Sequence, residues 1–159
     1  AHINSELEQK AQQLAVRTIE AMNLYGVLAV EMFLTADGDI LVNEVAPRPH
    51  NSGHHTIEAN ITSQYQQLLR SIFGFPLGST ALTTTSMMVN LLGEDGYTGE
   101  AIYEGLPECL AIEGVYVHLY GKKITKPFRK MGHVTIVDSD AAKAREKANF
   151  VKDNLKIKA

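Results

Sequence analysis

The sequence GVLAVEMFLTADGDILVNEV, residues 26–45, is followed at residues 48–54 by the polar loop RPHNSGH. The two apolar runs of the first stretch flank Asp37-Gly38, a dipeptide that favours a two-residue type I′ turn. The stretch therefore predicts a β-hairpin whose second strand leads directly into the polar loop. Both faces of this hairpin are largely apolar, as is typical of strands in a sheet that is covered on both sides.

The register of the hairpin decides whether two acidic residues meet. If Asp37 and Gly38 are the loop residues, counting outward from the turn pairs Glu31 with Glu44. Opposed Cβ atoms on antiparallel strands lie about 4.5 to 5.5 Å apart, and like charges at that separation repel. A cation is the obvious way to make such a pair tolerable among apolar neighbours. A one-residue bulge would instead put the carboxylates on opposite faces, where they would be ordinary solvated residues.

The loop after the second strand is stiff. Pro47 and Pro49 end the strand and restrict the residues before them to extended conformations, so Arg48 and His50 are held on a connection that presents their side chains. His50 and His54 also have the spacing of two zinc ligands on a helix, but Pro49 disfavours a continuous helix and no cysteine lies nearby. His54 could equally cap or pack at the start of the next helix, and His50 could hydrogen-bond a substrate.

Several segments together resemble the signature of the 5-(carboxyamino)imidazole ribonucleotide synthase family, the ATP-grasp enzymes of purine biosynthesis. The segment NEVAPRPHNSGH at residues 43–54, preceded by Val30-Glu31, is similar to the family's central motif. The match continues at residues 56–59, at 120–122 (YGK) and at 129–133 (RKMGH). The resemblance covers essentially all 159 residues, but it corresponds only to the C-terminal part of such an enzyme.

This resemblance implies ATP- and bicarbonate-dependent carboxylation of aminoimidazole ribonucleotide through carboxyphosphate. It implies that Glu31 and Glu44 hold magnesium, and that Asn43 and Glu44 contact the ATP phosphates. It also implies catalytic and substrate-binding residues beyond the hairpin. These are Arg48, His50 and Asn51 for bicarbonate or carboxyphosphate, Lys122 for catalysis and substrate, and Arg129 and Lys130 for aminoimidazole ribonucleotide.

Five cations lie within nine residues, with no acid among them: Lys122, Lys123, Lys126, Arg129 and Lys130. Such a run is usually a solvated turn, and a nucleic-acid patch is a second possibility. Few aromatic residues adjoin it and the chain is acidic overall, so a single phosphate is the better-sized partner.

One residue of this basic stretch departs from the family pattern. The family usually has glycine immediately before RKMGH, where this chain has Phe128. We expect this difference to affect the path of the loop around Arg129 and Lys130.

Taken in order, the chain predicts an α+β fold. The resemblance implies that the C-terminal half of an ATP-grasp domain is followed by a small β-rich domain. We expect these domains at residues 1–78 and 79–159. Apolar periodicity predicts a helix over 5–25, capped by Ser5 and Glu8, and a second helix over 57–72. The second domain is predicted to contain strands and helices at the following residues: strands 86–92, 116–120 and 133–137, and helices 99–106 and 141–155.

Composition sets the outer limits of function. With 45% hydrophobic residues, 21% charged residues and a net charge of −3, the 159-residue chain is ordinary globular material with no general case for nucleic-acid or membrane binding. The single cysteine, Cys109, excludes an internal disulfide and fits the cytoplasm. The sequence opens without an initiator Met, so we expect a fragment that lacks synthase activity, taken from an enzyme that is a homodimer. The alternatives are another purine-pathway ATP-grasp ligase and a non-catalytic nucleotide- or anion-binding module.

Overall fold

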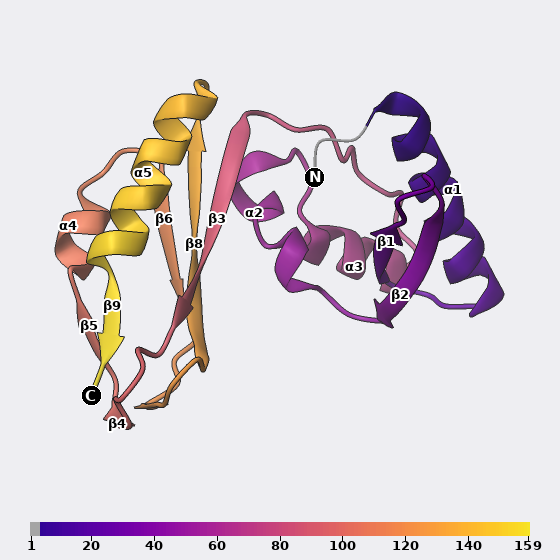
Figure 1. The fold of residues 1–159 in the computed structure, drawn as a ribbon. Coiled ribbons are helices and arrows are strands. Elements are labelled where there is room, and N and C mark those ends of the chain that lie inside the picture. The colour runs from indigo at the N-terminus through magenta and orange to yellow at the C-terminus, as the bar shows by residue number, and fades with distance from the viewer. Residues whose placement is uncertain (1–3) are drawn as a thin grey trace. The chain divides into compact units, whose positions relative to one another are not determined.

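The computed structural model describes residues 4–159 and divides them into two compact units (Figure 1). The first unit contains the described residues up to Gly53 together with Thr62–Ser79. The second contains His54–Ile61 and Thr80–Ala159. The short segment His54–Ile61 is therefore part of the second unit, although the chain on both sides of it belongs to the first.

The first unit opens with helix α1, Ser5–Ala21. Its N-cap is Asn4, whose side-chain oxygen accepts a hydrogen bond from the backbone N–H of Leu7 at 2.9 Å. The predicted cap at Ser5 is wrong, because the preceding residue supplies the acceptor that the first turn needs. The predicted end at Tyr25 is also too late, since Asn23 already adopts a left-handed φ of 49° and stops the helix.

Strands β1 (Ala29–Leu34) and β2 (Ile40–Ala46) form the predicted antiparallel hairpin. Its turn is one residue longer than the predicted two-residue turn. The N–H of Thr35 donates to the carbonyl of Asp39 at 2.9 Å, so three residues form the loop, and Gly38 takes the left-handed conformation with a φ of 88°. A three-residue loop with glycine at its left-handed position is a common hairpin connection.

A β-bulge in β2 then compensates for the longer turn. Met32 pairs with Val42, whereas Glu31 pairs with Glu44, so Asn43 is the extra residue. The turn shifts the register by one residue and the bulge shifts it back. The predicted pairing of Glu31 with Glu44 is therefore confirmed, although the two-residue turn from which it was counted is wrong.

The hairpin is a two-stranded sheet, and within residues 4–159 large apolar side chains on it remain exposed. Phe33 and Leu41, which pair across it, are 58% and 54% exposed.

The predicted helix over 57–72 is two helices, α2 (Thr56–Ala59) and α3 (Gln64–Ile72). The break follows from a capping box that the apolar periodicity conceals. The side chain of Ser63 accepts a hydrogen bond from the N–H of Gln66, and the side chain of Gln66 accepts one from the N–H of Ser63. These bonds satisfy two backbone donors at the start of α3 and favour a new helix there.

The second unit is built on a three-stranded antiparallel sheet in the order β3 (Thr85–Leu92), β8 (Lys130–Asp138), β6 (Val115–Leu119). These strands were predicted. Helix α5 (Ala141–Asn154), begun by two hydrogen bonds to the Asp140 carboxylate, packs on the sheet.

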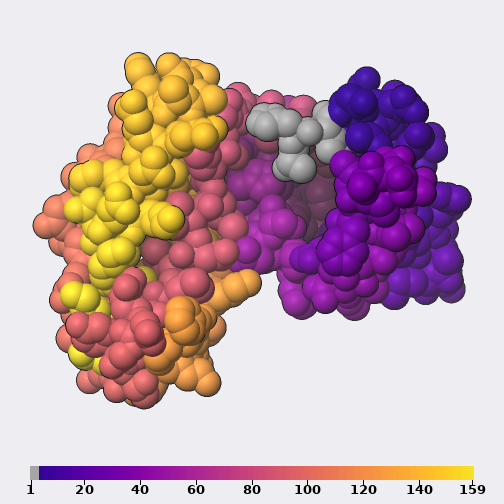
Figure 2. Space-filling model, viewed as in Figure 1, coloured from indigo at the N-terminus to yellow at the C-terminus, as the bar shows by residue number. Residues whose placement is uncertain are grey.

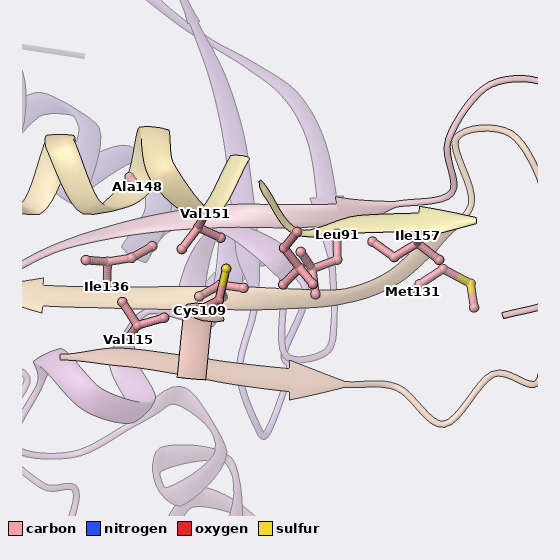
Figure 3. Close-up of a cluster of buried hydrophobic side chains, with 10 residues drawn as sticks. Leu91, Cys109, Val115, Met131, Ile136, Ala148, Val151 and Ile157 are labelled. Atoms are coloured by element: carbon pink, nitrogen blue, oxygen red, sulfur yellow. The ribbon is translucent and has the colours of Figure 1, made fainter. Parts of the chain in front are cut away.

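The hydrophobic core of this unit lies between the sheet and its helices (Figure 3). Val134 and Ile136 of the central strand face α5, while the alternate residues His133 and Thr135 face the opposite side of the sheet. The buried core residues are Leu91, Cys109, Val115, Met131, Val134, Ile136, Ala148, Val151, Leu155 and Ile157.

Short strand pairs complete the second unit. Strand β4 (Gly99–Glu100) pairs with β7 (Ile124–Thr125), and β5 (Ile102–Glu104) pairs with β9 (Lys156–Lys158). The predicted helix over 99–106 is therefore wrong, and helix α4 occupies Leu106–Leu110 instead. The C-terminal segment, yellow in Figure 2, adjoins pink-coloured residues of its own unit, and its strand β9 pairs with β5.

The α+β class is confirmed, since each unit combines helices with antiparallel strands. Among residues 4–159, no helix is both long and apolar enough to cross a bilayer.

Candidate functional site

The first part of the candidate site is the carboxylate pair on the hairpin. Glu31 and Glu44 are direct partners across β1 and β2, so their side chains leave the same face. Both residues are exposed, and an Oε1 atom of Glu31 lies 3.3 Å from Nε2 of His50. Two accessible carboxylates offer the hard oxygen ligands that magnesium takes in proteins, usually alongside water and substrate phosphates. The donor set therefore fits magnesium.

The loop after β2 holds His50 by its backbone. The side chain of Gln64, at the start of α3, accepts a hydrogen bond from the N–H of His50 at 2.9 Å and donates one to its carbonyl at 3.0 Å. Nδ1 of the ring is 2.9 Å from the hydroxyl of Ser52, which leaves Nε2 facing Glu31. His50 is thus fixed at both the main chain and the ring.

The two hydrogen bonds by which the Gln64 side chain clamps the His50 backbone require a glycine at position 53. A Cβ atom on Gly53 would lie 2.5 Å from Oε1 of Gln64, so any other residue would displace the amide that holds His50. Gln64 is absent from the residues that the sequence points to. The capping box that begins one residue earlier, at Ser63, is the signal that could have found it.

The remaining predicted site residues of the first unit lie on β2 or on the loop that follows it. Arg48 follows β2, and its Nη1 donates to the Pro49 carbonyl at 3.1 Å. Asn51 opens the 3-10 helix η1, Asn51–Gly53. Asn43 is the bulge residue beside Glu44. Apart from the second-unit cations, every predicted site residue lies on this hairpin or its loop.

The second-unit cations lie between the end of β6 and the start of β8, whose first residue is Lys130. Nζ of Lys122 donates to the carbonyl of Lys130 at 2.5 Å, so the two ends of the basic loop are brought together. Nη1 of Arg129 donates to the carbonyl of Ile124 at 2.7 Å, which turns the guanidinium toward the loop's own backbone. Phe128 has a φ of 61°, a left-handed conformation that favours glycine.

Three histidines lie on or next to the loop in the sequence, at positions 50, 54 and 55. No group of three or more His, Cys, Asp or Glu side chains that could hold a metal ion occurs among residues 4–159. The His54 ring instead stacks on that of His133, with 4.6 Å between ring centroids, so the packing interpretation of His54 is confirmed.

Cys109 is buried in the core of the second unit. Burial, followed by the nearby charge of Glu108, raises the pKa of its thiol. A raised pKa keeps the sulfur in its unreactive thiol form, which fits a packing residue.

Two family models match the chain. The ATP-grasp domain matches residues 1–65, and the phosphoribosylaminoimidazole carboxylase C-terminal domain matches residues 86–147. Among curated proteins, the N5-carboxyaminoimidazole ribonucleotide synthase of Bacillus subtilis is 49% identical over 137 residues. That alignment covers 86% of this chain and 34% of the relative.

Solved structures agree with these matches. The N5-carboxyaminoimidazole ribonucleotide synthetase of Thermotoga maritima matches this chain with a TM-score of 0.92 and 53% sequence identity. The match covers 100% of this chain and 44% of the Thermotoga maritima chain. The Aspergillus clavatus N5-carboxyaminoimidazole synthase, solved with ADP and 5-aminoimidazole ribonucleotide, has a TM-score of 0.83 and 34% identity, with coverages of 96% and 41%. The chain therefore spans between a third and a half of the length of these relatives.

Proposed function

The chain belongs to the N5-carboxyaminoimidazole ribonucleotide synthase family, and from that membership we propose that it is part of an ATP-grasp ligase. The proposed reaction is the carboxylation of aminoimidazole ribonucleotide, with ATP and bicarbonate as co-substrates. The observation that carries the proposal is the carboxylate pair Glu31 and Glu44 on one face of the hairpin, with His50 against Glu31. The central motif identified in the sequence, residues 43–54, occupies the second strand of this hairpin and the loop that follows it.

Glu31 and Glu44 would hold magnesium in this enzyme, with Asn43 beside them at the ATP phosphates. Bound magnesium would neutralise phosphate charge during transfer of the terminal phosphoryl group. The chain's own contribution is the register of β1 and β2. A turn and a bulge that offset each other bring the two carboxylates opposite one another.

Arg48, His50 and Asn51 would handle the carboxyl donor. Transfer of the phosphoryl group to bicarbonate gives carboxyphosphate, an anion that is best held by a guanidinium fork and fixed hydrogen bonds. The Gln64 clamp on the His50 backbone supports this proposal, because it would hold His50 without the entropy cost of ordering a mobile segment.

Lys122, Arg129 and Lys130 would bind aminoimidazole ribonucleotide. Its exocyclic amine attacks the carboxyl carbon of carboxyphosphate, the bond from that carbon to the phosphate oxygen breaks, and the amine loses a proton. N5-carboxyaminoimidazole ribonucleotide and inorganic phosphate result. The cations would act mainly by positioning and charge neutralisation. The proposal also includes a homodimer and, because the one cysteine is a buried free thiol, a cytoplasmic location.

The decisive experiment measures inorganic phosphate released by the full-length protein that contains this chain. We expect phosphate release to require bicarbonate and aminoimidazole ribonucleotide together. Lys122→Ala should lower the turnover number about 10- to 100-fold, because a charged hydrogen bond to substrate is lost. Phosphate release that does not depend on aminoimidazole ribonucleotide would refute the proposal in favour of another ligase. Binding of ATP without turnover would refute it in favour of a binding module.

A further inference from the structure

Three histidine rings form a stack in the second unit, on the side of the sheet that faces away from α5. The ring of His133, on β8, lies between the rings of His118 on β6 and His54 before α2. Its centroid is 4.5 Å from that of His118, with 12° between the ring planes, and 4.6 Å from that of His54, with 21° between the planes. The stack is therefore nearly parallel, with His133 at its centre.

The outer ring on β6 is anchored by an acid. Nε2 of His118 lies 2.7 Å from Oε1 of Glu58, a carboxylate on α2 whose side chain is only 9% exposed. Since a carboxylate can only accept, the imidazole N–H donates. This bond fixes the plane of the His118 ring and, through stacking, restricts the ring of His133.

The central ring is neutral near pH 7. Burial first, and then the charges of His118 and His54, lower the pKa of His133 from 6.5 to about 4. His133 is 2% exposed, and its Nδ1 lies 3.0 Å from the hydroxyl of Tyr120. The buried imidazole therefore acts as a fixed hydrogen-bonding partner for that phenol.

Tyr120 connects this stack to Lys122. Its ring lies against those of His133 and His54, at centroid separations of 5.8 and 6.3 Å. The Lys122 ammonium lies 5.6 Å from the centroid of the Tyr120 ring, within the range of a cation–π interaction. Gly121 between them has a φ of 66°, and this left-handed turn brings the lysine back over the ring.

We propose that Tyr120 and His133 are positioning residues for Lys122. The inference rests on the proposed function, because it assumes that Lys122 acts on substrate. A lysine side chain is flexible and loses considerable rotamer entropy when it is held in one place. The Tyr120 ring beneath the ammonium and the Lys130 carbonyl beside it restrict that freedom before substrate arrives. His133 keeps the ring in place.

The test uses Tyr120→Leu and Tyr120→Phe in the full-length protein, with phosphate release and carboxylated product both measured. Loss of the ring should lower kcat about 10-fold, since positioning is lost, while the KM for ATP stays unchanged. Tyr120→Phe keeps the ring and loses only the hydroxyl, so kcat should fall less, about 2- to 5-fold. His133→Asn, which keeps a hydrogen-bonding group near the position of Nδ1, should be milder than His133→Leu.

The chain offers a matched control at Tyr97. This tyrosine is 37% exposed, as Tyr120 is, and it also lies beneath a lysine, with Nζ of Lys158 5.7 Å from its ring centroid. Tyr97→Leu removes an equivalent cation–π contact away from the histidine stack and should leave kcat unchanged. An equal fall in kcat for Tyr97→Leu and Tyr120→Leu would overturn the proposal.

A double-mutant cycle separates positioning from general structure. In a Lys122→Met background, Tyr120→Leu should have little further effect, because the group it positions is gone. If kcat falls by the same factor with and without Lys122, Tyr120 does not act through this lysine. If Tyr120→Leu does not fold, as judged by thermal unfolding, Tyr120→Phe goes through the same cycle and decides the question.

The same measurements keep the two proposals apart. Failure of the unmodified protein to carboxylate aminoimidazole ribonucleotide would overturn the proposed function. Normal turnover that is lost in Lys122→Ala but retained in Tyr120→Leu would overturn only the positioning role.

Discussion

At the scale of single residues, His133 couples folding to pH. Its pKa in the folded chain is about 4, against an ordinary value of 6.5, because burial and the neighbouring imidazoles disfavour the charged ring. Below pH 6.5 the unfolded chain binds a proton that the folded chain does not. Stability is therefore fully present above pH 6.5 and is lost as the pH falls toward 4.

The expected loss between pH 6.5 and 4 is at most about 3 kcal/mol in the free energy of unfolding. It would be measured by urea unfolding of the 159-residue chain at several pH values, beside His133→Asn. The groups that face the ring are His54, His118 and the Tyr120 hydroxyl. Parallel pH profiles for the two proteins would show that His133 is not the titrating group.

Phe128 is a second residue whose conformation predicts a measurable effect. It is 70% exposed and has a φ of 61°, while its N–H still donates to the Gly93 carbonyl at 2.8 Å. Phe128→Gly should exceed Phe128→Ala in free energy of unfolding by about 1 kcal/mol, since alanine keeps the left-handed strain and glycine removes it. Equal urea midpoints for the two variants would contradict this account.

At the scale of elements, the hairpin shows what the sequence could predict and what it could not. Apolar runs around Asp37-Gly38 predict two strands, and Glu31 and Glu44 do face each other. The extra loop residue and the bulge at Asn43 were not predictable, because each depends on hydrogen bonds between strands rather than on local sequence. Their effects on register cancel, and so Glu31 still pairs with Glu44.

Other errors have similar causes. The break between α2 and α3 was missed because helical periodicity continues through Ile61, and the capping signal at Ser63 competes with it. The stack of His54, His118 and His133 was missed because its rings come from three segments that are far apart in the sequence. No spacing pattern predicts such a contact. In contrast, Lys122 and Arg129 were placed on one basic loop directly from their sequence.

The contact between β6 and β8 gives an element-scale prediction. A Cβ atom on Gly132 would lie 2.3 Å from the carbonyl oxygen of His118, which belongs to the backbone of the neighbouring strand. Gly132→Ala should therefore force these strands apart and lower the free energy of unfolding by about 2 kcal/mol or more.

Gly96→Ala is the matched control in the same unit. Gly96 has a φ of 82°, but a Cβ atom added to it would meet no atom within 4 Å, so only backbone strain of about 1 kcal/mol is expected there. Both variants would be compared by thermal and urea unfolding. A cost at Gly132 no greater than that at Gly96 would mean that the strands can separate without loss.

At the scale of the whole molecule, the two units differ in how completely they bury their apolar side chains. The second unit has a closed core, whereas the first leaves large apolar side chains in solvent on its hairpin and on α3. Leu69 and Ile72 of α3 are 54% and 57% exposed, and Phe33 and Leu41 of the hairpin are 58% and 54% exposed. Apolar exposure of this extent is typical of a surface that another part of a protein covers.

This exposure leads to a prediction about activity. We expect the 159-residue chain alone to release no phosphate in response to bicarbonate and aminoimidazole ribonucleotide. Its exposed carboxylates would leave bound phosphates hydrated, and its sequence contains no glycine-rich phosphate loop of the Walker type, so both positioning and electrostatic preorganisation would be lost.

The assay compares the purified chain with the full-length protein at equal molar concentration, both with and without magnesium. A full-length Glu44→Gln variant shows how much turnover survives when a proposed metal ligand is lost. Weak binding of phosphate or ATP by the chain, detected by calorimetry, would agree with the prediction, since Arg48 and Lys122 are present. Turnover by the chain comparable to that of the full-length protein would show that the exposed face of the first unit needs no cover for catalysis.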